Sequence, residues 1–317
     1  MNLQSFILSR FQINLKNVDP NFRGFQPMSL PIKKRLKEIG LAFLYGYHAS
    51  YKHSQSNIEE QIDIISDELK GFSFEGAGMG FAFMDICSNS SHFQKFISKE
   101  AKKHIYMTYI GSGWALAKLK FVNYKNFMNK LDPILKWLVL DGYGFYEGYF
   151  NTVRSIINHR IPQKFVDKYD AHAYMQGIGR SIWFYCGGDL YSINIVIQGF
   201  DEKFQGDLWS GIGLASAYAN GIPIDKYSYL KDLSGNYYPE LCQGVAFACE
   251  ARRLAELPMD KTNHIAMEVA GLNAHDMASI TLLEKRDLPS EDNSYEQWRR
   301  NIQKHFNGGK VKNEISK

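Results

Sequence analysis

The chain has 317 residues, of which 45% are hydrophobic, 14% aromatic and 22% charged, a composition typical of a globular protein that buries a core. Its net charge of +4 comes from basic residues scattered along the sequence, which argues against a nucleic-acid-binding surface. No stretch reaches the roughly 18 consecutive apolar residues that a membrane-spanning helix needs. We therefore expect a soluble, cytoplasmic protein that has no membrane span.

Three regions are predicted in chain order. Residues 1–40 form an N-terminal lead-in, whose first residues are too polar for a secretory signal. Residues 41–285 form a helical-repeat domain of about six to eight helix pairs. Residues 286–317 are rich in charge and are expected to be a polar tail.

The prediction of repeats rests on glycine spacing. Segments such as FEGAGMGFA (74–82), YIGSGWALA (109–117) and WSGIGLASA (209–217) share a glycine followed four positions later by a small residue. The aligned glycines are Gly76, Gly111, Gly148, Gly177, Gly211 and Gly244. They are separated by 35, 37, 29, 34 and 33 residues.

Residues four apart share one helix face, so each pair predicts a shallow groove into which a neighbouring helix packs closely. A period near 34 residues corresponds to two helices and two turns. The predicted fold is therefore all-α, built of helix-hairpin repeats as a tetratricopeptide-like superhelix or a closed α/α ring. The concave face of such an array would form a groove. A phosphate-binding glycine loop is not favoured, because no GK[ST] follows the glycines.

Polar residues precede most of the aligned glycines. These positions are Glu75, Ile110, Glu147, Gln176, Ser210 and Gln243. They predict either a ring of hydrogen-bonding groups around a cavity or, as the favoured interpretation, a structural ladder between repeats.

Arg180 lies in an otherwise apolar segment and needs an acidic partner, for which Glu147 or Glu75 is available, unless it binds a carboxylate or phosphate. Asp141 and Glu147 form a candidate pair for acid–base catalysis, with a turn expected between them at Gly142 and Gly144. The candidate catalytic residues are Glu147, Arg180, Glu75 and Asp141. The candidate ligand-binding residues are Gln176, Gln243, Asp207, Trp209, Tyr106, Tyr143 and Tyr174.

Metal and cofactor chemistry is not indicated. The nine histidines form no HExxH pair and the four cysteines no CxxC pair, so we predict no metal and no cofactor. The histidines of DAHAY (170–174) and NAHDMAS (273–279) are interpreted as surface or capping residues, and the cysteines as buried thiols.

Several segments together resemble a known family. They are FRGF (22–25), FEGAGMGFAFMD (74–85), HIYMTYIGSGWALAKL (104–119), LDPILKWLVLDGYGFYEGYF (131–150), QGIGRSIWFYCGGD (176–189), DLWSGIGLASAYANG (207–221) and CQGVAFACEARR (242–253). Over about residues 20 to 285 the chain resembles bacterial domain-of-unknown-function family 1702. The resemblance implies a protein associated with secondary-metabolite biosynthesis, as for the UnbL-type proteins encoded beside enediyne polyketide synthases. It transfers no catalytic residue.

Two functions follow from these expectations. The first is an accessory protein that binds an extended apolar ligand or a biosynthetic partner protein in its concave groove. The alternative is a cofactor-independent enzyme that acts on a polyene-like substrate through a polar ring in an apolar pocket. The sequence leaves open whether the protein is catalytic and whether it forms a homodimer.

Overall fold

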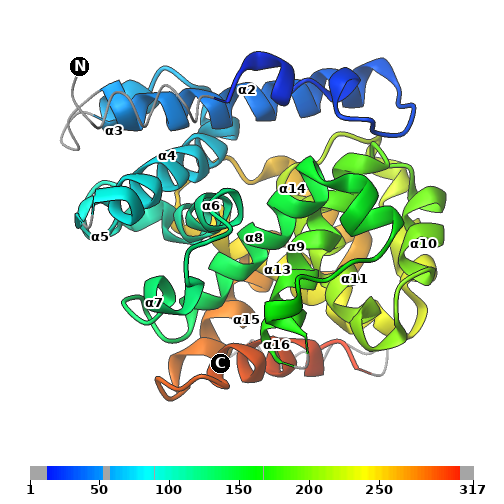
Figure 1. The fold of residues 1–317 in the computed structure, drawn as a ribbon. Coiled ribbons are helices and arrows are strands. Elements are labelled where there is room, and N and C mark those ends of the chain that lie inside the picture. Colours follow the sequence, from blue (N-terminus) through cyan, green and yellow to red (C-terminus); the bar gives the residue numbers. More distant parts are fainter. Residues whose placement is uncertain (1–12, 53–57, 89, 167, 308–317) are drawn as a thin grey trace.

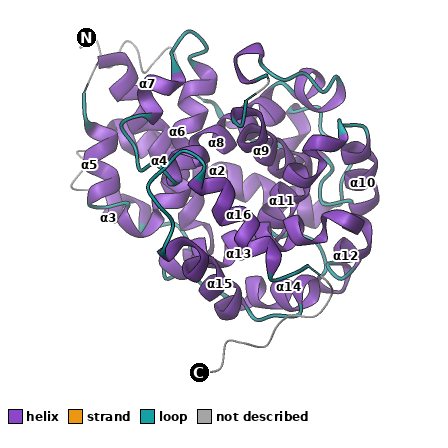
Figure 2. Ribbon diagram, turned by 90° about the horizontal axis from the view of Figure 1, so that it is seen from below, coloured by secondary structure: helices purple, strands orange, loops and turns teal. Residues whose placement is uncertain are grey.

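The computed structural model describes residues 13–52, 58–88, 90–166 and 168–307, and in these ranges it contains 15 α-helices and no strand (Figures 1 and 2). The all-α prediction is confirmed. The longer helices are α2 (Leu30–Lys52), α4 (Asp67–Ser88), α6 (Ile105–Lys118), α8 (Leu138–Phe150), α9 (Asp170–Tyr185), α11 (Glu202–Tyr218), α13 (Tyr238–Leu254) and α15 (Ala274–Arg286). The others are α3 (Ile58–Ile62), α5 (His92–Ser98), α7 (Tyr124–Met128), α10 (Leu190–Gln198), α12 (Tyr229–Ser234), α14 (Asp260–Ala270) and α16 (Ser294–Lys304).

The longer helices pack in series, each against the next along the chain from α2 to α15. Consecutive members of this series run in the same direction. In α11 and α13, for example, Ser210 bonds Gln243 and the Tyr218 carbonyl accepts from Arg252, which are offsets of 33 and 34 residues. Shorter helices return the chain and pack antiparallel, as α5 does on α4, where Phe81 meets Phe96 and Asp85 caps the first turn of α5.

Glycines let neighbouring helices approach to backbone contact. A methyl group at Gly177 of α9 would lie 1.8 Å from the carbonyl oxygen of Asp141 on α8, and one at Gly179 would lie 2.2 Å from that of Leu208 on α11. In the five pairs that begin at Gly76, Gly111, Gly142, Gly177 and Gly211, the first glycine faces the preceding helix and the second faces the following one. The same contacts involve Gly76, Gly78, Gly111, Gly113, Gly142, Gly144, Gly211, Gly213 and Gly244. The prediction that these glycines serve helix packing is confirmed.

The alignment of the third glycine segment was wrong. Gly142 and Gly144 lie inside α8, not at a turn, and they make the backbone contacts with α6 and α9. Gly148 is six residues later and faces only the Ser181 hydroxyl and the end of Ile178. Asp141, rather than Glu147, therefore occupies the position before the packed glycine.

The series of helices curves so that its early and late members meet. The Tyr218 ring of α11 packs against Phe72 of α4, with 5.3 Å between ring centroids, and Tyr106 of α6 lies 6.5 Å from the Trp298 ring of α16. Two cavities among these helices measure only about 20 and 30 Å³. Side chains therefore fill this part of the interior.

The segment expected to be a polar tail contains a helix, α16, with one buried face. In α16, Tyr295, Trp298 and Ile302 are each at most 2% exposed, at the i, i+3 and i+7 positions of one face. This face packs on α13 and α15, and α16 lies at the lower edge of the molecule in Figure 1. At the other end, residues 30–40 of the expected lead-in are the first turns of α2.

No helix in the described parts of the chain is both long and apolar enough to cross a membrane, as the sequence predicts.

Candidate functional site

A buried ion cluster joins α4, α8 and α9. Arg180 Nη1 donates to Asp141 Oδ1 at 2.5 Å, and its Nη2 lies 3.7 Å from Glu75 Oε1, which also accepts from the Trp114 indole. Burial raises the pKa of Glu75 to about 7, while the Arg180 charge opposes that rise. All three ionisable side chains are at most 5% exposed, so a guanidinium here is stabilised by its acids rather than by water.

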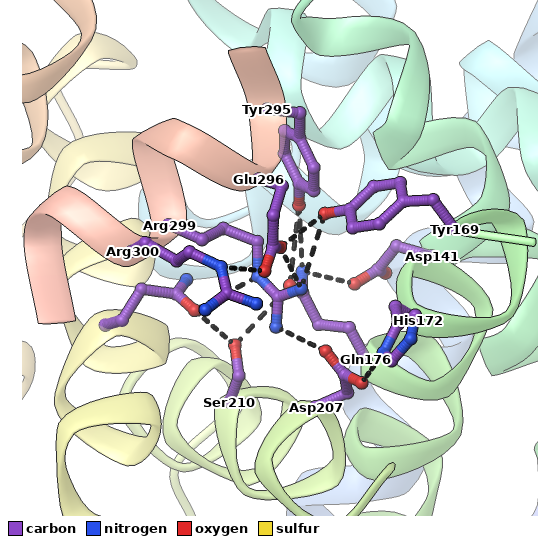
Figure 3. Close-up of polar contacts among 11 residues, drawn as sticks. Asp141, Tyr169, His172, Gln176, Asp207, Ser210, Tyr295, Glu296, Arg299 and Arg300 are labelled. Atoms are coloured by element: carbon purple, nitrogen blue, oxygen red, sulfur yellow. Dashed lines mark hydrogen bonds and ion pairs between the residues drawn. The ribbon is translucent and has the colours of Figure 1, made fainter. Parts of the chain in front are cut away.

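From this cluster a chain of hydrogen bonds leads towards the surface (Figure 3). Gln176 donates to Asp141 at 2.8 Å, and the Ser210 hydroxyl lies between the side-chain oxygens of Gln176 and Gln243, at 3.4 and 2.8 Å. Arg299 then reaches Gln243 at 3.3 Å. Of the predicted positions, Gln176, Ser210 and Gln243 therefore bond one another as the ladder interpretation predicts, and Asp141 stands in the place expected for Glu147.

Helix periodicity brings these groups onto shared faces. His172, Gln176 and Arg180 follow at intervals of four along α9, and Asp207 and Ser210 are three apart on α11. On α16, Tyr295 and Arg299 are again four apart, and the Tyr295 hydroxyl lies 3.3 Å from Gln176 Nε2. The polar faces of α9, α11 and α16 thus meet, and their side chains form one continuous line of polar groups.

The line ends at an ion cluster beside a surface cleft. Arg299 Nη2 donates to Asp207 Oδ1 at 2.7 Å, and Asp207 Oδ2 lies 2.7 Å from His172 Nδ1. Arg299 is 2% exposed and Asp207 is 9% exposed, whereas the His172 side chain is 38% exposed. A carboxylate at Nδ1 favours the tautomer whose Nε2 carries a lone pair, and leaves that nitrogen for a ligand.

The cleft has a volume of about 590 Å³. It is lined by His172, Asp201, Glu202, Lys203, Gly206, Asp207, Tyr237, Glu240, Glu296, Arg299, Arg300 and Gln303. Burial raises the pKa of Glu240, while the Arg299 charge opposes that rise and the Asp207 charge adds to it. Of the candidate residues from the sequence, only Asp207 lines this cleft.

The other candidates are distributed through the interior. Glu147 is 2% exposed and lies apart from the Arg180 cluster. It pairs instead with Lys120, at 3.3 Å, and accepts a hydrogen bond from Asn151. The Arg180–Glu147 pair is therefore absent, and Asp141 takes that role. Tyr143 and Tyr174 pack together, with 6.2 Å between ring centroids. Trp209 is 2% exposed in the core, and Tyr106 lines one of the small cavities.

Sequence reasoning missed most residues of the cleft. They include His172, Glu240, Glu296, Arg299 and Arg300. The spacing of His172, Gln176 and Arg180 could have indicated one polar face. Nothing local links Arg299 to Asp207, which is 92 residues earlier.

The described residues contain no group of three or more histidines, cysteines or acids that could hold a metal ion. Three of the cysteines are buried as predicted. Cys87 differs from the prediction, because it is exposed near the end of α4.

Comparison with models of protein families gives a match over most of the chain. The model of the family "Protein of unknown function (DUF1702)" matches residues 4–306. No curated protein and no solved structure matches the chain. Because the matched residues span nearly its whole length, the chain belongs to the DUF1702 family.

Proposed function

We propose that the protein is an accessory protein of polyketide-type secondary-metabolite biosynthesis that binds an extended apolar ligand. The biosynthetic context rests on the resemblance to the UnbL-type proteins. In this proposal the helices form a stack of helix hairpins with a packed interior. The ligand lies in a groove on the outer surface, and the packed helices hold the walls of that groove in place.

The observation that carries the proposal is an open groove of about 1040 Å³. Three segments line it: 26–31 before and at the start of α2, 186–192 after α9, and 221–233 after α11. Its walls include Met28, Leu190 and Ile222, and Tyr191 and Tyr229 on its rim are 70% and 61% exposed. Grooves of this size lined by apolar and aromatic side chains are typical of small-molecule sites.

The buried polar residues favour binding over catalysis. Glu75, Asp141 and Arg180 satisfy one another, and the cavity that touches Glu75 and Arg180 holds only about 30 Å³. A substrate the size of a polyene does not fit in such a space. The catalytic alternative would therefore require the interior to open.

Ligand binding can be tested with parinaric acid, a fluorescent polyene fatty acid. We expect the protein to bind it, and Tyr191→Ser combined with Tyr229→Ser to weaken binding at least about fivefold through lost apolar contact. Phe121→Ser is the control, since Phe121 is 84% exposed but lines a different depression. Absence of binding, or equal weakening by the control, would contradict the proposal.

The catalytic alternative is tested in the host. Glu147→Gln and Arg180→Met are introduced, and metabolites are measured by mass spectrometry together with the amount of folded protein. Unchanged product per folded protein supports the accessory role. Loss of product by a normally folded variant would favour an enzyme.

A further inference from the structure

The cleft beside His172 has its own chemistry and shares no lining residue with the apolar groove. An inference about it therefore stands or fails independently of the proposed function. The question is which kind of ligand group its walls can satisfy.

The cations of the cleft are already occupied by protein partners. Arg299 uses all three of its nitrogens, towards Asp207, Gln243 and Glu296, at 2.7, 3.3 and 3.3 Å. Lys203 lies 3.5 Å from Asp201, and Arg300 Nε donates to Glu296 at 2.7 Å. An anionic ligand would therefore have to compete with these acids.

The groups left over on the walls are acceptors. His172 Nδ1 is held by Asp207, and among the described residues no hydrogen bond to Nε2 is present. Glu240 Oε2 is buried without a hydrogen-bond partner in the described structure. Within the same residues, neither Glu240 nor Glu202 forms an ion pair, so the unpaired charge of the cleft is negative.

Aromatic rings hold the imidazole in place. The His172 ring stacks on Tyr169 at 5.8 Å and meets the edge or face of Phe204 at 5.3 Å, centroid to centroid. Its Nδ1 is held by Asp207, which Arg299 bonds in turn. Its orientation is set before any ligand arrives, which reduces the entropy cost of binding.

We propose that this cleft binds the ammonium group of an aliphatic amine, which donates a hydrogen bond to His172 Nε2 and lies against the carboxylates of Glu240 and Glu202. The ammonium supplies the donors that the walls lack, and its charge offsets the unpaired acids. The Tyr237 ring on the cleft wall provides apolar surface for the alkyl chain. The remainder of the ligand extends into solvent.

The test compares n-butylamine, n-butanol and butyrate at pH 8, by calorimetry and by NMR of the histidine ring nitrogens. These probes share a chain but differ in charge and donors. We expect n-butylamine to bind at least about tenfold more tightly than the other two and to shift the His172 Nε2 signal. Stronger binding of butyrate, or no preference among the three, would overturn the proposal.

Variants locate the site. We expect His172→Gln and the isosteric Glu240→Gln each to weaken n-butylamine binding at least about fivefold. His264→Gln and Glu268→Gln, at exposed positions of α14, are matched controls and should not change it. Thermal melts confirm that each variant is folded. Binding that survives both His172→Gln and Glu240→Gln in folded proteins refutes the assignment.

Discussion

Arg299 on α16 donates to Asp207 on α11, with 2.7 Å between Nη2 and Oδ1, and both side chains are almost fully buried. This pair joins the C-terminal helix to the middle of the helical series. It also closes the line of polar groups that begins at Glu75 and Arg180. The buried face of α16, the last helix among the described residues, is thus part of the core.

Removing that guanidinium should therefore destabilise the protein. We expect Arg299→Met to lower the free energy of unfolding by about 3–5 kcal/mol, because it leaves Asp207 buried with an uncompensated charge. Arg300→Met is the matched control, since the Arg300 side chain is 70% exposed, and should cost at most about 1 kcal/mol. Urea denaturation measures both, and equal effects would show that the buried pair contributes nothing.

The glycine contacts give a second comparison within α11. A methyl group at Gly211 would lie 2.1 Å from the Gln176 carbonyl oxygen, and since backbone cannot move aside, Gly211→Ala should cost about 2–4 kcal/mol. At Gly206 the nearest atom is the flexible Glu240 Cγ at 3.3 Å. There alanine should be neutral or stabilising by up to about 1 kcal/mol through its higher helix propensity. The reverse order of stability, measured by thermal unfolding, would contradict the packing role.

The glycine pattern made the all-helical fold predictable, because helices that pack closely need small residues at the contact, and these recur in the sequence at regular intervals. The third segment was misaligned because Gly148 is also followed, four positions later, by a small residue, Thr152. Taking Gly142 instead gives separations of 31 and 35 residues in place of 37 and 29. The uneven separations of 37 and 29 residues on either side of Gly148 were the sequence signal that this segment was misaligned.

The cleft was less predictable because its residues come from helices far apart in the chain. Asp207 meets His172 and Arg299 only after α9, α11 and α16 have packed. In the sequence, Arg299 stands in a charged segment where the buried residues Tyr295, Trp298, Ile302 and Phe306 are separated by polar ones. The burial of an arginine depends on the partner that tertiary structure supplies.

The Arg180–Asp141 pair should show strong energetic coupling. Asp141→Asn removes the nearer of the two carboxylates that neutralise the Arg180 charge. Arg180→Met leaves Asp141 and Glu75 without the cation that both of them contact. In a double-mutant cycle we expect the two effects to be non-additive by about 1–3 kcal/mol, so that the second substitution costs less once the first is present. Additive effects in equilibrium unfolding would mean that the pair does not interact.

Glu75 should make stability depend on pH. Its pKa in the folded protein is raised to about 7, so the fold binds its proton more tightly than the unfolded chain does. Its contribution is therefore present below the unfolded pKa, near 4.5, and is lost as pH rises towards 7. Relative to Glu75→Gln, the wild-type protein should lose about 3 kcal/mol over this range, measured by urea titrations at several pH values. Parallel curves for the two proteins would contradict the shift.

His104 should act in the opposite sense. It stacks on Phe74 at 3.8 Å, and burial, together with the charges of Lys70 and Lys103, lowers its pKa to about 4 from 6.5. The unfolded chain then binds the proton more tightly, so the stability that His104 contributes is present above pH 6.5 and is lost as pH falls towards 4. Because this trend offsets that of Glu75, His104→Gln should reveal a steeper decline in stability from pH 4.5 to 7 than the wild type shows. Glu75→Gln should instead become more stable with rising pH up to 6.5. If both variants keep the wild-type slope, neither group titrates in the fold as its burial requires.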